Sequence, residues 1–160
     1  MKVFVNNKQN RVSLELGIYR KLLRKLLKEC RVTGEVGLTF VDDEAIRKLN
    51  RQYRQLDRPT DVLSFAMREG EKTPREENLL GDIVVSVETA QRQAKEYQPD
   101  LNETEGLTAE LSFLIIHGFL HLAGYDHQSD DDALIMKKRE RELLSPNDSE
   151  IMTSRKVYSG

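Results

Sequence analysis

The stretch LTAELSFLIIHGFLHLAGYDH, residues 107–127, decides the fold because it is the most apolar segment of the chain. Residues 107–122 carry few polar side chains, which predicts a helix buried at the centre of the molecule. Gly124 follows the last apolar residues, and a glycine at such a position commonly ends a helix by taking a left-handed conformation. We therefore expect a central helix followed by a reversal of the chain.

The same stretch contains every histidine of the 160-residue chain. His117 and His121 are four residues apart, which places both rings on one face of the predicted helix, and the turn at Gly124 can bring His127 back toward them. Three neutral imidazoles without a fourth protein ligand nearby are typical of a catalytic zinc site with one open position. Zinc in such a site lowers the pKa of bound water to about 7, which favours metal-assisted hydrolysis. The alternative, that the histidines are core residues, is disfavoured by their spacing and by the lack of histidine elsewhere.

Patterns on either side of this stretch predict an α+β fold with a small four-stranded mixed sheet, about five helices and the zinc motif on the central apolar helix. Helices connect the first three strands, so we expect those strands to be parallel. The fourth follows a long charged loop at residues 68–80 and should pair antiparallel. Ser13, and either Asp42 or Asp43, are expected to cap the first two helices. The strands are expected at residues 2–7, 35–41, 60–67 and 81–88, and the helices at 13–30, from 42 or 43 to before 59, 88–97, 107–122 and 129–144.

The composition is that of a globular protein, with 38% apolar and 32% charged residues. We expect residues 1–160 to form a single hydrolase domain in which 145–160 are a polar tail. The longest apolar run, residues 111–116, is too short for a membrane span, and the N-terminus has no signal-peptide pattern. Cys30 is the single cysteine, which favours a reducing, cytoplasmic location. The net charge of −2 does not by itself predict nucleic-acid binding.

The histidine spacing H-x3-H-x2-G-x2-H is that of the metzincin metalloproteases. Those enzymes need a glutamate directly after the first histidine as the general base. Gly118 occupies that position here and cannot accept a proton. The ligand pattern is therefore metzincin-like, while the base that peptide hydrolysis needs is missing.

Three motifs together resemble a known family. HGFLHLAGYDH at 117–127, YRQLDRPTDVLSF at 53–65 and LLGDIVV at 79–85 resemble the YbeY family of bacterial endoribonucleases, in the family's order and over nearly the whole chain. One departure is Ala66, where the family often has proline. The resemblance implies a single-strand-specific endoribonuclease that contains one Zn²⁺ per chain. It implies a cytoplasmic role in maturing ribosomal RNA, notably the 3′ end of the small-subunit RNA, and in ribosome quality control.

The resemblance also implies a set of site residues and partners. The metal ligands would be His117, His121 and His127, and the catalytic residues would be Arg54 and His117. The expected partners are single-stranded RNA or ribosomal RNA and the ribosome or its proteins; neither a membrane nor DNA is expected.

Local charge is compatible with an RNA substrate. Arg47, Arg51 and Arg54 on the second helix, with Arg58 just beyond it, have helical spacing and are expected to share one face. An arginine near the metal could stabilise charge on a phosphate in the transition state. The basic run at residues 20–28 is better explained as a solvated helix face.

Several acidic residues have less certain roles. Asp126 could orient a histidine or serve the turn. Asp61 and Asp82 lie in the family motifs without an assignable role, and residues 130–132 are most simply acids at a helix start.

The sequence leaves three functions open. The first is a zinc hydrolase in which water or a ribose hydroxyl attacks a phosphate held by Arg54, with zinc hydroxide itself able to serve as the base. The second is a metalloprotease-like peptidase whose base comes from elsewhere. The third is a non-catalytic, ribosome-associated binding module stabilised by zinc.

Overall fold

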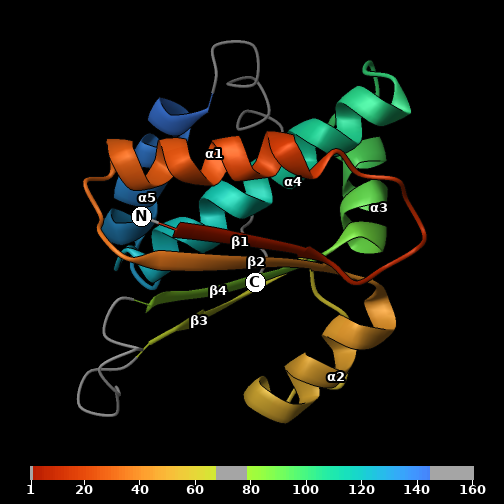
Figure 1. The fold of residues 1–160 in the computed structure, drawn as a ribbon, viewed down its shortest axis with the longest axis horizontal. Helices are drawn as coiled ribbons and strands as arrows, with labels where there is room; N and C mark the ends of the chain where they lie inside the picture. The colour runs from red at the N-terminus through yellow and green to blue at the C-terminus, as the bar shows by residue number, and fades with distance from the viewer. Residues whose placement is uncertain (1, 68–78, 145–160) are drawn as a thin grey trace.

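The computed structural model describes residues 2–67 and 79–144, and it confirms the expected α+β class. Within these ranges a four-stranded mixed sheet packs with five helices (Figure 1). The predicted tail at 145–160 and most of the predicted loop at 68–80 lie outside the described residues. The elements are, in order, β1 (Lys2–Asn7), α1 (Leu16–Glu29), β2 (Glu35–Val41), α2 (Asp43–Arg54), β3 (Val62–Ala66), β4 (Leu79–Ser86), α3 (Val87–Tyr97), α4 (Glu103–Leu122) and α5 (Asp130–Leu143).

The strand order is β1-β2-β4-β3, and it corrects one expectation. β1 and β2 are parallel and β4 pairs antiparallel with β3, as predicted, but β3 does not run parallel to β1 and β2. The reason is the segment after α2, which doubles back along the helix: the Asn50 side chain donates to the Arg58 carbonyl at 2.9 Å. β3 therefore starts at the end of the sheet where β2 finishes, and it takes the outer edge beside β4.

The start of α2 is where the sequence predicted it, whereas the starts of α1 and α4 differ from the prediction. Asp42 caps α2 as predicted, because its side chain accepts a hydrogen bond from the Ala45 amide at 2.9 Å. Ser13 does not cap α1, which begins at Leu16 after Glu15. α4 begins four residues before the predicted start because the Asn102 side chain accepts from the Glu105 amide at 2.8 Å. The apolar pattern alone did not include this first polar turn.

The sheet separates two hydrophobic clusters. α1 and α4 lie on one face, and α2 lies on the other (Figure 1). The larger cluster, between the sheet and α4, includes Phe40, Phe113 and Phe119, which are almost completely buried. The smaller cluster lies beneath α2 and consists of Val41, Ile46, Leu63 and Val84. No helix within the described ranges is both long enough and apolar enough to cross a membrane.

Asp43 ties the start of α2 to the end of β4 and to α3. Its Oδ1 accepts from the hydroxyls of Thr89 at 2.6 Å and Ser86 at 2.7 Å, and Arg92 lies 2.9 Å from its Oδ2. Burial raises the pKa of Asp43, but the hydrogen bonds from Thr89, Ser86 and Arg92 outweigh it, and the net pKa lies below its usual value. The Asp43 carboxylate is therefore ionised at neutral pH.

Candidate metal centre

The three histidines are brought together by the end of α4. The Tyr125 amide donates to the Leu120 carbonyl at 2.9 Å and the Gly124 amide donates to the His121 carbonyl at 3.1 Å, which is the hydrogen-bond pattern of a Schellman motif. Gly124 has a φ of 100°, a conformation that a residue with a Cβ rarely adopts. The predicted reversal is thus confirmed, and it returns the chain to the histidine face of the helix.

The ring nitrogens of the three histidines converge on one point. One ligand atom from each of His117, His121 and His127 lies within 4.8 Å of the others. The Nε2 atoms of His117 and His121 are 3.2 Å apart. Two nitrogens bound tetrahedrally to one zinc at about 2.0–2.1 Å would be about 3.3 Å apart, so this pair already has the spacing that zinc requires. His117 is buried while the other two are partly exposed, so an ion held here would be reachable from solvent.

A buried carboxylate from α5 holds the first histidine. The Nδ1 of His117 lies 3.1 Å from Oε1 of Glu140, and the side chains are 1% and 0% exposed. A carboxylate only accepts hydrogen bonds, so it favours the imidazole tautomer that is protonated at Nδ1 and leaves the Nε2 lone pair for a cation. Sequence reasoning missed Glu140. The available signal was its position among the buried residues Met136 and Leu143, where an apolar residue is expected.

The second histidine is kept neutral. Burial, followed by the neighbouring charges of His117 and His127, lowers the pKa of His121 to about 4. Asp126 and a hydrogen bond to the Tyr125 backbone act in the opposite direction but do not prevail. His121 therefore carries no proton on at least one nitrogen near pH 7, which is the form that binds a metal.

Gly118, where a metzincin has its glutamate, faces the sheet and not open space. A Cβ built there would lie 3.0 Å from the Ser64 Oγ and from the Ile83 Cγ2, and 3.2 Å from the Val62 Cγ2. The Ser64 hydroxyl also donates to the Gly118 carbonyl at 2.9 Å. The close contact of α4 with β3 and β4 thus explains the glycine, and a larger side chain would point into this packed interface.

Arg54, the predicted phosphate-binding residue, contacts the edge strand. Its Nη2 donates to the Ser64 carbonyl at 2.9 Å, and its Cζ lies 5.2 Å from the centroid of the Phe65 ring. Within the described parts of the chain, its polar and ring contacts are made to β3 and not to the histidines. Ser64 links Arg54 to the histidine helix: its carbonyl accepts from Arg54, and its hydroxyl donates to the carbonyl of Gly118, which lies between His117 and His121 in sequence.

The predicted arginine stripe is only partly present. α2 ends at Arg54, where Gln55 takes a left-handed conformation with a φ of 58°, so the turn at Gln55 breaks the helical spacing before Arg58, which lies beyond the helix as expected. Arg47 pairs with Asp57, with 2.9 Å between its Nε and the Asp57 Oδ1, and this hydrogen bond lowers the pKa of Asp57. The charge of Arg47 is therefore balanced locally.

The acidic residues near the motifs have structural partners. Asp126 accepts a hydrogen bond from the His127 amide at 2.7 Å and so serves the turn. Asp61, which is 1% exposed, accepts from the Val62 amide at 2.7 Å and from Gln93 at 3.2 Å. Burial raises the pKa of Asp82, whose carboxylate lies against Gly37. Residues 130–132 form the first turn of α5, as predicted.

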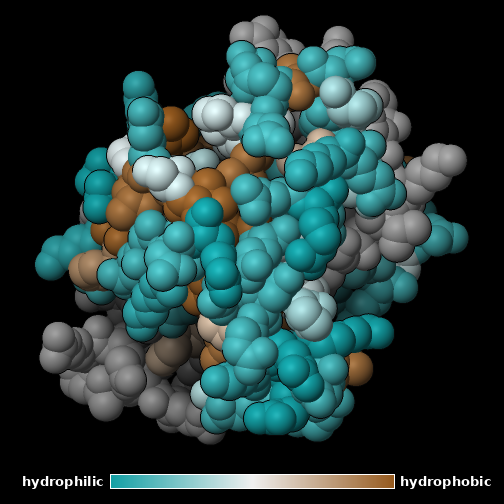
Figure 2. All heavy atoms as spheres, turned by 90° about the vertical axis from the view of Figure 1, so that its right-hand side faces the viewer, coloured by the Kyte–Doolittle hydropathy of each residue, from teal (hydrophilic) through white to brown (hydrophobic). Residues whose placement is uncertain are grey.

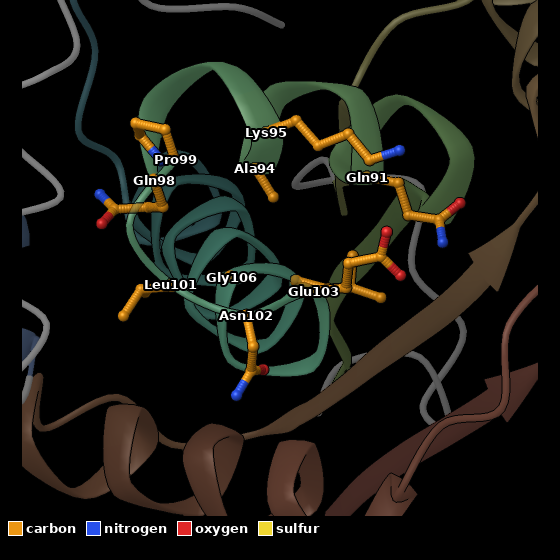
Figure 3. Close-up of a pocket in the computed structure, with 10 residues that line it drawn as sticks. Gln91, Ala94, Lys95, Gln98, Pro99, Leu101, Asn102, Glu103 and Gly106 are labelled. Carbon is orange, nitrogen blue, oxygen red and sulfur yellow. The ribbon is translucent and has the colours of Figure 1, made fainter.

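A separate hollow of about 400 Å³ lies between α3 and the first turn of α4 (Figure 3). Gln91, Lys95, Asn102 and Glu103 are among its lining residues. Figure 2 shows this side of the molecule, where the surface is largely hydrophilic. The hollow is at the opposite end of α4 from the histidines, and none of the predicted site residues lines it.

Comparisons with known proteins agree with these features. Residues 4–148 match the family model described as Endoribonuclease YbeY. A protein named endoribonuclease YbeY from Desulforamulus reducens is 46% identical over 153 residues, covering 90% of this chain and 95% of its own. A protein of the same name from Pelotomaculum thermopropionicum is 44% identical over 151 residues, with the same coverage of both chains.

Among solved structures, the solution structure of a Thermotoga maritima protein is 27% identical to this chain. It superposes with a TM-score of 0.60 and covers 94% of this chain and 89% of its own. The fold, the histidine cluster and these relatives lead to one conclusion: the chain belongs to the Endoribonuclease YbeY family.

Proposed function

We propose that this protein is a zinc-dependent endoribonuclease that cleaves single-stranded RNA. Its role would be the maturation of ribosomal RNA, at the 3′ end of the small-subunit RNA, and ribosome quality control in the cytoplasm. Residues 1–160 would act as one domain. The observation that carries the proposal is the histidine cluster backed by buried Glu140, in a chain of an endoribonuclease family.

His117, His121 and His127 would hold the ion, through the nitrogens that converge in the structure. When bound, a zinc ion supplies a Lewis acid that polarises an oxygen of water or phosphate. Glu140 keeps the His117 ring in the orientation and tautomer that this requires. Burial keeps His121 neutral, so its nitrogen does not have to lose a proton first.

Arg54 would bind a phosphate oxygen of the RNA. One of its five N–H donors is bound to Ser64, and the others remain available for a phosphate, whose geometry matches the guanidinium. The same contact fixes the side chain at the edge of β3, close to the helix that carries the histidines. Charge that develops on the phosphate during cleavage would be stabilised from this position.

Two observations disfavour the peptidase. The position of the missing glutamate is packed against side chains of β3 and β4, so even a Cβ at Gly118 would require Ser64, Ile83 and Val62 to shift. A peptide would normally add to the free edge of a sheet through backbone hydrogen bonds. At the edge strand β3, the Ser64 carbonyl is already occupied by Arg54.

The proposal is tested by incubating the purified protein and zinc with a small-subunit ribosomal RNA fragment or with an unfolded protein. We expect cleavage of the RNA alone, and its loss with chelator or in His121→Ala. Arg54→Glu should retain zinc binding and lose cleavage, whereas Arg24→Glu, a charge reversal on α1, should retain both. Cleavage of the protein substrate with intact RNA would support the peptidase, and neither cleavage, with unfolding on chelation, would support the binding module.

A further inference from the structure

The end of α2 exposes an aromatic residue beside arginine. Tyr53 is 52% exposed and its ring lies 5.2 Å from that of Phe65, at an interplanar angle of 66°. Arg54 lies over the same Phe65 ring. We call Tyr53, Arg54 and Phe65 the Tyr53 patch.

The packing of the fold does not account for Tyr53. Phe65 is partly buried and packs against the small cluster beneath α2, so it has a structural role. Tyr53 lies outside that cluster, and about half of its surface is open to solvent. An exposed aromatic ring that packs against a partly buried one is typical of a binding surface.

The guanidinium of Arg54, which lies over the Phe65 ring, forms no ion pair with any described residue. Arg51, one turn earlier on α2, is close enough to Asp57 to help lower the pKa of that carboxyl. Arg47, on the same helix, is paired with Asp57. An exposed ring next to a guanidinium that is free of acidic partners among the described residues is the combination that binds single-stranded nucleic acid, by stacking on the base and pairing with the phosphate.

We propose that the Tyr53 patch binds one unpaired base of the RNA substrate, which stacks on the Tyr53 ring while Arg54 donates to the neighbouring phosphate. This inference rests on the proposed function and extends it by naming where the strand is held. Phe65 and Ser64 are neighbours on the edge strand, and Ser64 contacts Gly118 on the histidine helix. A strand held on the patch can therefore pass over the edge of the sheet to the metal centre. Duplex RNA cannot present a free base face, so the patch selects unpaired RNA.

The first test uses fluorescence, because the chain contains no tryptophan. Tyr53→Trp places the only tryptophan of the chain at the proposed stacking position, where it can be excited selectively. We expect a short oligouridylate, added in the presence of a chelator so that it is not cleaved, to quench this tryptophan. An abasic oligomer with the same phosphates should not. Phe4→Trp, at a β1 position where the side chain is 48% exposed, is the matched control and should show no base-dependent change.

The second test measures affinity by fluorescence anisotropy with a labelled oligouridylate. Tyr53→Ala should weaken binding by about 5- to 150-fold, the range for one stacked base, and Tyr53→Phe should restore it. Both variants should unfold at the wild-type temperature, because Tyr53 is outside the core. Wild-type affinity for the oligomer in Tyr53→Ala would overturn the base-stacking inference but not the proposed function. The same result is expected if the patch binds a protein partner. No binding of the oligomer by the wild-type protein would overturn the proposed function as well.

Discussion

Glu140→Gln separates the role of the buried carboxylate from that of the fold. The amide has the same shape and can still accept a hydrogen bond from the His117 Nδ1, which lies 3.1 Å from the carboxylate in the wild type. A hydrogen bond to a charged group contributes about 1.5–3 kcal/mol and one between neutral groups about 0.5–1.5 kcal/mol. A bound cation makes the His117 N–H a stronger donor, so we expect this difference mainly in the zinc-bound state, as a loss of about 1–1.5 kcal/mol or roughly tenfold in zinc affinity. Second-sphere changes of this type typically cost 10- to 100-fold.

Without zinc, Glu140→Gln should not destabilise the protein, in contrast to its effect when zinc is bound. Glu140 is 0% exposed, so removing its charge relieves a desolvation cost, and the metal-free variant should be at least as stable as the wild type. With zinc, tenfold weaker binding removes about 1.4 kcal/mol of the stabilisation by metal, or roughly 3–6 °C in Tm for a chain of this size.

Zinc affinity is measured by competition with a chromophoric chelator, and Tm by calorimetry with and without zinc. Glu142→Gln, on the same helix at an exposed position that pairs with Arg139, is the matched control and should bind zinc as the wild type does. Unchanged zinc affinity in Glu140→Gln would refute the assignment of Glu140 to the metal centre. Equal destabilisation with and without zinc would show that its role is packing.

Three further predictions follow from the packing of α4 and α2. Gly118→Glu should destabilise the protein by about 1–3 kcal/mol or more in urea unfolding, because even its Cβ would lie 3.0 Å from atoms of β3 and β4; wild-type stability would contradict this close packing. Gly124→Ala should lower the free energy of unfolding by about 1–2 kcal/mol, because alanine is strained at a φ of 100°, and it should weaken zinc binding in a chelator titration. Gly17→Ala, where an added Cβ would have no atom within 4 Å, is the control and should have neither effect. Asp43→Asn should be less stable than the wild type by about 1 kcal/mol at neutral pH. Because the folded pKa of Asp43 is lowered, that difference should be lost as the pH falls below about 4 through the folded value, and a pH-independent difference would exclude the carboxylate as its source.

Local patterns predicted most of the architecture. The apolar run of α4, the alternation in β2 and the cap at Asp42 are each encoded by residues close in sequence, and the structure has them where they were expected. The convergence of the histidines was equally local, since it needed only helical spacing and one glycine turn.

Features that depend on distant partners were not predictable. The direction of β3 follows from its antiparallel pairing with β4, a strand that comes later in the chain, and from the return of the chain along α2, where the Asn50 side chain bonds to the Arg58 carbonyl. The role of Glu140 depends on its contact with His117, which lies 23 residues earlier in the chain on another helix. No local sequence pattern predicts that contact. The role of Arg54 stays a prediction, and its contact with Ser64 follows from the strand order, which no local pattern encodes.

The bond from Arg54 to Ser64 has a consequence for solubility. β3 is one of the two outer strands of the sheet, and an outer strand with free carbonyls is a template for pairing with another molecule. The guanidinium covers one of those carbonyls and places a positive charge where a second strand would dock. We therefore expect Arg54 to reduce aggregation through β3 as well as to bind the substrate, so that a substitution at this position would affect both properties.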